Sequence, residues 1–477
     1  MNKIVLEIPE ELKVMVSALR DTVETAMKQV ERAKLGDAVA YARFEREISE
    51  RLCEVERQAH AASLAALDPN APRLSINKVL HVRVLEDVEA TFMSFAGPVK
   101  VTRSLYRPAG ERNAPTVDVV AQRAGAVEDF WLPATAREMA FDIQQLTSRE
   151  AETTGKRRGR LPYSRSSFER VAHAVGEMHV QQHEGIEQVL IERFEVPEET
   201  HSVTVSLDRV SVPMEEPLDE EQTSFDGTKR VIQRVYRMAY CATVTLHDVD
   251  AKALYTIRYG TMPGGDPQGL CAGVADDVVA LLAQRPDLMV GLLCDGAHEM
   301  WNLLDEEFTK APFNTREIIV QRLIDFWHAI EKLAPAAKVI AGDEESKPLL
   351  ARWKLLLRNS RSGRSKILRE LHASGKEDVA VGDSVPVHEA ITYFTNNAAR
   401  MNYAAARARG LPIGSGNVEA TCKSLVDVRM KRPGSRWKNR TGEHIIHMRA
   451  LALSDRWDDA MDIVLRPPRI RVRPAAA

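Results

Sequence analysis

The chain has 477 residues, of which 44% are hydrophobic, so two or three domains with sizeable cores are possible. Its formal net charge of -3 is close to neutral, although basic and acidic residues gather in local runs. The sequence contains no apolar stretch of the roughly 20 residues that a membrane-spanning helix needs. The charged N-terminus is untypical of a secretory signal peptide. The five cysteines are scattered without a C-x-x-C pair, which argues against a structural zinc site. We therefore expect a soluble, cytoplasmic protein that makes no membrane contact.

Residues 1–70 are predicted to form a helical region. Val16, Leu19 and Val23 recur at helical spacing, and the many charges between them indicate a helix that packs on one face only. A helical hairpin and a dimerising coil both fit, because no clean heptad persists. The alternating run over 99–106 then predicts a small β-rich region over 71–130.

Residues 131–198 are predicted to be helical, in the order helix, basic connector, helix. The connector Lys156-Arg-Arg-Gly-Arg160 separates a helix that ends near Leu146 from one that begins near Ser164. This order resembles a helix-turn-helix, whose second helix enters the major groove of DNA, although the connector is longer than usual. A plain helical hairpin fits equally well. The candidate DNA-binding residues in this region are Lys156, Arg157, Arg158 and Arg160.

From residue 199 to 330 the pattern changes to strands. Strands are expected over 203–212, 237–247, 252–259, 288–294 and 318–325, with helices over 270–284 and 300–308. An antiparallel meander followed by parallel strands with crossover helices is the element order of the RNase H-like fold. We therefore predict a multidomain α+β or α/β protein with an RNase H-like mixed sheet.

This core is expected to be discontinuous in the sequence. A largely helical insertion over 331–410 would interrupt it, and residues 411–460 would complete it. The final stretch, 461–477, is predicted to be an extended basic tail.

Three acidic residues stand where elements of this core would converge. Asp208 shares one face of its strand with Ser206 and Val210, Asp295 follows a continuous apolar strand, and Glu419 follows a glycine-bracketed turn at the start of a helix. Taken singly, they fit an exposed strand acid, a turn former and a helix N-terminal acid. Together, three carboxylates from different elements can hold two Mg²⁺ or Mn²⁺ ions for phosphodiester cleavage. We predict such a site, in which these residues are catalytic.

Other polar residues near these acids have open roles. His298, Asp325 and His328 are candidates to support metal or DNA, although a core-satisfied histidine is an equally good interpretation. Glu215 and Asp226 are rival acids near Asp208, on a predicted loop.

A basic run with an aromatic residue follows the predicted helix of Glu419. Arginine and lysine neutralise phosphates, and a tryptophan can stack on an unpaired base. The alternative is a solvated loop that Trp437 anchors to the core. The candidate DNA-binding residues here are Lys423, Arg429, Lys431, Arg432, Arg436, Trp437, Lys438 and Arg440.

At these residues the sequence resembles the ISKra-type insertion-sequence transposases, a DDE group with an RNase H-like core. The resemblance is most specific over 412–437 and continues in 447–451. The segments 205–210, 294–297 with Trp301, and 325–328 look similar too, and the last also resembles the Mutator-like transposases. The resemblance covers roughly residues 90 to 460.

The resemblance implies DNA transposition, with Asp208, Asp295 and Glu419 as the metal-binding triad. An activated water would nick the transposon end, and the 3′-hydroxyl would attack target DNA. Transposases commonly act as homo-oligomers because two ends must be paired. Related families carry a cysteine-rich ribbon after the β-segment, but residues 107–113 contain no cysteine, so we expect no zinc.

Two alternatives remain open at this point. One is a domesticated, non-catalytic DNA-binding protein, which three converging carboxylates argue against. The other is an RNase H-like nuclease that cuts without joining, which the sequence does not separate from a transposase.

Overall fold

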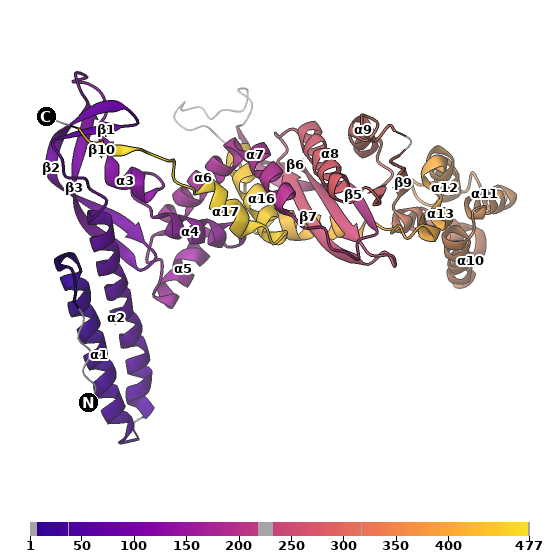
Figure 1. Ribbon diagram of the computed structural model, residues 1–477. Coiled ribbons are helices and arrows are strands. Elements are labelled where there is room, and N and C mark those ends of the chain that lie inside the picture. The colour runs from indigo at the N-terminus through magenta and orange to yellow at the C-terminus, as the bar shows by residue number, and fades with distance from the viewer. Residues whose placement is uncertain (1–6, 37, 218–231, 316, 476–477) are drawn as a thin grey trace, which may run out of the picture. The chain divides into compact units, whose positions relative to one another are not determined.

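The computed structural model describes residues 7–36, 38–217, 232–315 and 317–475, and Asp226 therefore lies outside the described residues. The chain divides into two compact units (Figure 1). The first unit combines Met1–Gln181 with Asp458–Ala477, and the second is Gln182–Trp457. Among the described residues, no helix is long and apolar enough to cross a membrane.

The first unit begins with a pair of helices, α1 (Lys13–Ala33) and α2 (Ala38–Ala65), which lie side by side (Figure 1). Of the two arrangements that the sequence left open, these residues adopt the hairpin. The buried residues of α1 are the polar Thr22 and Gln29, whereas apolar side chains such as Val23 and Met27 are exposed.

A five-stranded antiparallel sheet follows the hairpin and confirms the predicted β-rich region. Its order is β10-β1-β2-β3-β4, so the C-terminal strand pairs with the first strand of the sheet. The strands are β1 (Arg73–Ile76), β2 (Val79–Ser94), β3 (Gly97–Pro108), β4 (Val117–Asp118) and β10 (Val472–Pro474). Leu64 of α2 packs with Phe92, Val101 and Val120 in one core. Val120 belongs to α3 (Val119–Ala124).

The predicted basic connector is wrong, because three helices stand where two were expected. They are α4 (Pro133–Gln145), α5 (Ser148–Arg158) and α6 (Arg165–Gln181). Lys156, Arg157 and Arg158 form the last turn of α5. A capping box between Thr147 and Glu150 begins this helix, and Gly159 ends it, so local capping makes the basic run helical.

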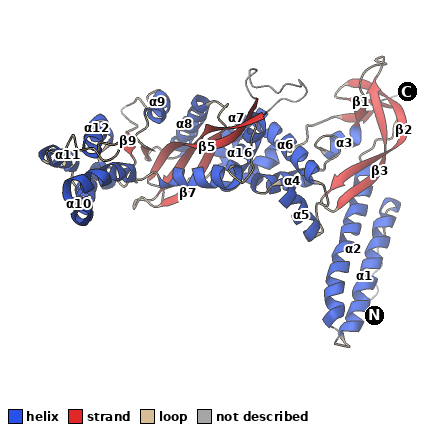
Figure 2. Cartoon of the chain, turned by 180° about the vertical axis from the view of Figure 1, so that it is seen from behind, coloured by secondary structure: helices blue, strands red, loops and turns tan. Residues whose placement is uncertain are grey.

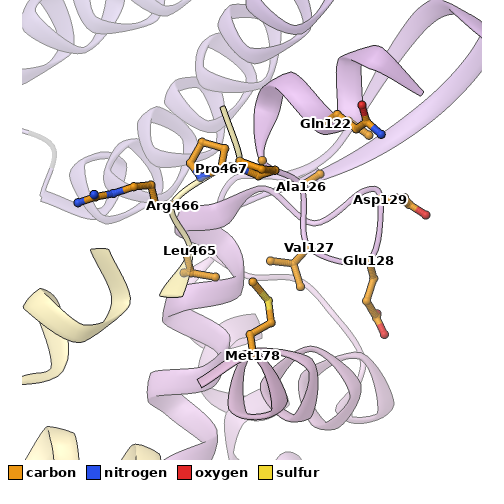
Figure 3. A pocket seen from close by; sticks show the side chains of 12 residues that line it. Gln122, Ala126, Val127, Glu128, Asp129, Met178, Leu465, Arg466 and Pro467 are labelled. Atoms are coloured by element: carbon orange, nitrogen blue, oxygen red, sulfur yellow. The ribbon is translucent and has the colours of Figure 1, made fainter. Parts of the chain in front are cut away.

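The C-terminal segment packs against α3 and the loop that follows it. Gly125 has a left-handed φ of 66°, and a Cβ atom there would stand 2.8 Å from Cβ of Pro467. Leu465 lies with Val127 and Met178 around a cavity of about 230 Å³ (Figure 3). This volume is below the roughly 300–1,000 Å³ of ordinary ligand pockets, and we assign no ligand to it. The segment is preceded by α17 (Trp457–Val464).

The second unit contains a mixed sheet of order β7-β6-β5-β8-β9 (Figure 2). Its strands are β5 (Ser202–Pro217), β6 (Ile232–His247), β7 (Ala253–Thr261), β8 (Met289–Cys294) and β9 (Val320–Ile324). The first three are antiparallel, whereas β5, β8 and β9 run parallel. An antiparallel meander extended by two parallel strands is the predicted RNase H-like sheet, and the predicted fold class is confirmed.

Helices pack on both faces of this sheet because β5 is apolar on both sides. Val203, Val205 and Leu207 pack with α8 (Pro267–Gln284) and α9 (His298–Glu307). Val212 and Met214 pack with the helices of the last core segment. These are α14 (Gly416–Thr421), the π-helix η4 (Cys422–Asp427), α15 (Val428–Met430) and α16 (Asn439–Leu453).

A helical insertion separates β9 from α14, as predicted. It comprises α10 (Phe326–Asn359), α11 (Gly363–Ala373), α12 (Pro386–Asn396) and α13 (Tyr403–Ala408). Gly342 interrupts α10 with a φ of 77° and a ψ of 175°, so the helix has two arms. Leu333, Trp353 and Phe394 of the insertion share one core with Leu293 of β8 and Leu323 of β9. The second unit begins with α7 (His183–Arg193).

Candidate active site

Three aspartates lie level with one another on three neighbouring strands: Asp208 lies within β5, and Asp295 and Asp325 directly follow β8 and β9. β5 and β8 pair Ser206 with Leu293, and Asp208 and Asp295 stand two residues beyond that pair. β8 and β9 pair Cys294 with Ile324, so Asp325 is level with Asp295. The carboxyl ends of parallel strands are the edge of an α/β sheet where ligands usually bind. The sheet therefore lines up three carboxylates at that edge.

Asp208 lies half-buried on the face of β5 that η4 covers. Its Oδ1 accepts a hydrogen bond from the backbone of Arg209 at 2.7 Å, and its Oδ2 accepts one from Sγ of Cys422 at 3.5 Å. Burial raises the pKa of Asp208, and the neighbouring carboxylate of Asp295 raises it further, against the hydrogen bond from Arg209. A cation beside Asp208 would favour its ionised form and so oppose this shift.

Asp295 sits at the turn between β8 and α9. Its Oδ1 accepts a hydrogen bond from the backbone of Ala297 at 2.9 Å, and its carbonyl accepts one from Nε1 of Trp301 at 2.7 Å. Gly296 faces α12 so closely that a Cβ atom there would stand 2.5 Å from the ring of Tyr393. His298, the first residue of α9, is exposed. The turn at Asp295 is therefore fixed by hydrogen bonds from Ala297 and Trp301 and by the ring of Tyr393.

Glu419 lies in the first turn of α14 with its side chain exposed. Its Oε1 is 3.4 Å from Nε2 of His328. Cys422 stands three residues further on, which places it on the same side of a helix as Glu419. Because Cys422 contacts Asp208, the start of this helix lies over the aspartate of β5.

Asp325 connects the end of β9 to the turn that precedes Glu419. It is fully buried, and its Oδ1 accepts a hydrogen bond from the backbone of His328 at 2.9 Å. Its Oδ2 accepts hydrogen bonds from the hydroxyl of Ser415, at 2.9 Å, and from the backbone of Ser415. The backbone of Phe326 also donates to the carbonyl of Ile413 at 2.9 Å. The glycine-bracketed turn is thus bound to the sheet by Asp325.

One group of potential metal ligands in the described chain contains Asp325, His328 and Glu419, whose ligand atoms lie within 4.8 Å of one another. Asp325 already accepts three hydrogen bonds from the protein. These hydrogen bonds hold the turn that precedes Glu419 against the end of β9. His328, which is half-buried, also contacts Glu331 at 3.4 Å.

Trp437, in the basic run, is bound to the outer part of β5. Its backbone amide donates to the carbonyl of Pro213 at 3.0 Å, and its Nε1 donates to the carbonyl of Met430 at 2.9 Å. The guanidinium of Arg429, which is buried, lies 5.0 Å from the centre of its ring. The loop-anchoring interpretation therefore describes the contacts of Trp437, whereas a contact with DNA stays a prediction.

The remaining basic candidates differ in their surroundings. Lys431 pairs with Asp427 at 2.8 Å, and Lys438 lies 3.8 Å from the rival acid Glu215. Glu215 therefore faces the basic run and stands seven residues past Asp208 on β5. Arg432 is half-buried. The side chains of Lys423, Arg436, Lys438 and Arg440 are exposed.

In the first unit, two of the four basic candidates are ion-paired. Lys156 pairs with Glu152 at 2.7 Å, and Arg160 pairs with Glu56. Arg157 and Arg158 are exposed at the end of α5.

Sequence reasoning missed two neighbours of the acids, Cys422 and Ser415. Ser415 lies inside the glycine-bracketed turn, Gly414-Ser-Gly416, but nothing in the sequence indicates that its partner is Asp325. Cys422 forms a close pair with Cys241, which lies opposite Asp208 on β6. The hydrogen bond with Cys241 and burial raise the pKa of the Cys422 thiol.

No protein-family model matches this chain, and no curated protein is similar to it. Among solved structures, the chain is similar to the Drosophila P element transposase strand transfer complex, with 12% identity over 69% of this chain and 80% of that chain, at a TM-score of 0.25. It is also similar to the Mos1 transposase paired-end complex with left transposon end, with 13% identity over 58% of this chain and 77% of that chain, at a TM-score of 0.17. Both similarities are too weak to carry a functional conclusion.

Proposed function

We propose that this chain is a DDE-type DNA transposase of the ISKra type, which cuts transposon ends and joins the 3′-hydroxyl to target DNA. The observation that carries the proposal is the level pair of Asp208 and Asp295 at the carboxyl edge of an RNase H-like sheet, with Glu419 on a helix that lies over Asp208. The resemblance of residues 412–437 to that group supports the assignment.

The donor set fits two Mg²⁺ or Mn²⁺ ions. Asp208, Asp295 and Glu419 offer carboxylate oxygens, which these cations prefer. When bound, the ions would activate the attacking water and stabilise the leaving oxygen.

The chain's own residues would position the reacting groups. Asp325 binds Ser415 and so holds the helix of Glu419 in place. His328 can donate a hydrogen bond to Glu419 and keep its carboxylate oriented. The exposed residues Lys423, Arg436, Lys438 and Arg440 would bind DNA phosphates beside the acids. A homo-oligomer in the cytoplasm would pair two transposon ends.

The proposal is tested by cleavage and joining of a labelled transposon-end DNA with Mg²⁺ or Mn²⁺. The variants Asp208→Asn, Asp295→Asn and Glu419→Gln should lose both reactions below detection while they still bind DNA. Glu215→Gln is the matched control, because it removes an acid from the same strand outside the aspartate row, and it should stay active.

Other outcomes would separate the alternatives. Cutting without joining would identify a nuclease. DNA binding without either reaction, with both metals, would identify a non-catalytic binding protein. If one of the three variants stayed active, that residue would not belong to the site.

A further inference from the structure

Trp327 differs from the other tryptophans in its exposure. The chain has six tryptophans, of which four are buried and Trp437 is half-buried against β5. The side chain of Trp327 is 57% exposed. Much of this large aromatic ring is therefore accessible to a binding partner.

Trp327 contacts two segments beside the candidate active site. It lies in the first turn of α10, between Asp325 and His328. The ring of Phe326 packs against it edge-on, with centroids 5.3 Å apart and an interplanar angle of 79°. A Cβ atom on Gly414 would stand 3.4 Å from Cδ1 of Trp327, so the ring rests against the turn that leads to Glu419.

A cation lies over the same ring. Nζ of Lys354 is 5.5 Å from the centre of the Trp327 ring. Lys354 belongs to the second arm of α10, beyond the interruption at Gly342, so the kink in α10 brings the two side chains together. An ammonium group and an exposed aromatic ring at one place offer an attraction for phosphate and a surface for stacking.

We propose that Trp327 and Lys354 form a binding site for an unpaired DNA base and its phosphate, next to the bond that is cut. The ring would stack on the base, and Lys354 would neutralise the adjoining phosphate. The inference rests on the proposed function for its choice of DNA as ligand. It concerns binding, however, and is measurable without cleavage.

The test compares two DNA probes in buffer without divalent metal. One is a duplex with a short unpaired thymidine arm and a 2-aminopurine at the junction, and the other is the fully paired duplex. In the full-length chain, Trp327→Ala should weaken binding of the forked probe by about 5- to 150-fold, as expected for the loss of one stacked base. Binding of the paired duplex should not change.

Conservative variants keep the test independent of folding. Trp327→Phe should retain most of the affinity and the quenching of 2-aminopurine fluorescence, because it keeps an aromatic ring. Leu355→Ala is the matched control, since this neighbour of Lys354 is 61% exposed. It should bind both probes as the wild type does.

The outcomes separate this inference from the proposed function. If the wild type never cuts DNA but binds the forked probe through Trp327, the stacking site stands and the transposase proposal fails. If Trp327→Ala is folded and binds both probes like the wild type, the stacking site is overturned, whatever the chain cleaves. Absence of binding to either probe would overturn both. A loss of self-association in Trp327→Ala, with unchanged DNA binding, would mean that a second copy covers the ring.

Discussion

The burial of Asp208 lowers the stability of the fold but places an ionisable carboxylate at the candidate active site. The folded chain buries it and places Asp295 beside it, and both effects raise its pKa. An acid whose pKa is raised on folding is costly to keep ionised, so it lowers stability at a pH above its folded pKa. That penalty shrinks as the pH falls below the folded pKa, and it is gone once the pH is below the pKa of the unfolded chain as well.

The Asp208→Asn variant should therefore be more stable than the wild type in metal-free buffer near neutral pH. A gain of about 0.5–2 kcal/mol in the free energy of unfolding is typical when a strained functional residue is relieved. Urea denaturation at several pH values measures it, and the gain should shrink as the pH is lowered.

The matched control is Asp287→Asn. The hydrogen bond from the Arg285 guanidinium lowers the pKa of Asp287 to about 2, so its shift has the opposite sign. Neutralising it should lower the free energy of unfolding or leave it unchanged. A destabilised Asp208→Asn variant would contradict the account of the site. Addition of Mg²⁺ should stabilise the wild type more than that variant.

Helix ends show how an element can depend on a distant segment. Gly125 ends α3 and Gly159 ends α5, with φ values of 66° and 67° and the same pattern of amide hydrogen bonds. A Cβ atom at Gly125 would meet Pro467, whereas at Gly159 it would meet nothing within 4 Å. The two positions differ in this contact and share the backbone conformation.

Gly159→Ala should lower the free energy of unfolding only by the cost of a left-handed backbone conformation, about 1–2 kcal/mol. Gly125→Ala should lower the free energy of unfolding by a further 1 kcal/mol or so, because Pro467 must move. Urea denaturation of the two variants measures the difference. Equal losses in both would show that the C-terminal segment does not press on α3.

At the scale of the whole molecule, the chain leaves its first unit and returns to it. Residues 458–477 come back after the second unit, and β10 pairs with β1 through Leu74, Ser75 and Ile76. The predicted basic tail is therefore partly a strand, because the exposed edge of β1 offers backbone hydrogen bonds that an extended segment can satisfy.

A chain that ends at Leu465 should lose stability in the first unit alone. The edge of β1 and the contact of Pro467 with Gly125 would both be lost, so amide hydrogens of β1 and α3 should exchange faster. Those of β5 and β8 should be unchanged. A chain that ends at Ala475 keeps β10 and serves as the control. Uniform exchange changes in both units would contradict the division of the chain.

Several elements were predictable because their information is local. The apolar alternation of β5 and the continuous apolar run of β8 predicted strands, and these strands occur. The charges of the basic run at Lys156 predict a connector, whereas the capping box between Thr147 and Glu150 begins a helix that includes this run. Charge alone is compatible with both a loop and an exposed helix face.

The sequence by itself determined the order of strands and helices, because hydrophobic periodicity follows from which side of each element is buried. It also supplied the acids in their chain order. Only the tertiary structure decided which residues meet. Strand register makes Asp208, Asp295 and Asp325 level, and packing buries Asp325 against Ser415. The same packing ties Trp437 to β5 and leaves Trp327 exposed, since such contacts join segments far apart in the chain.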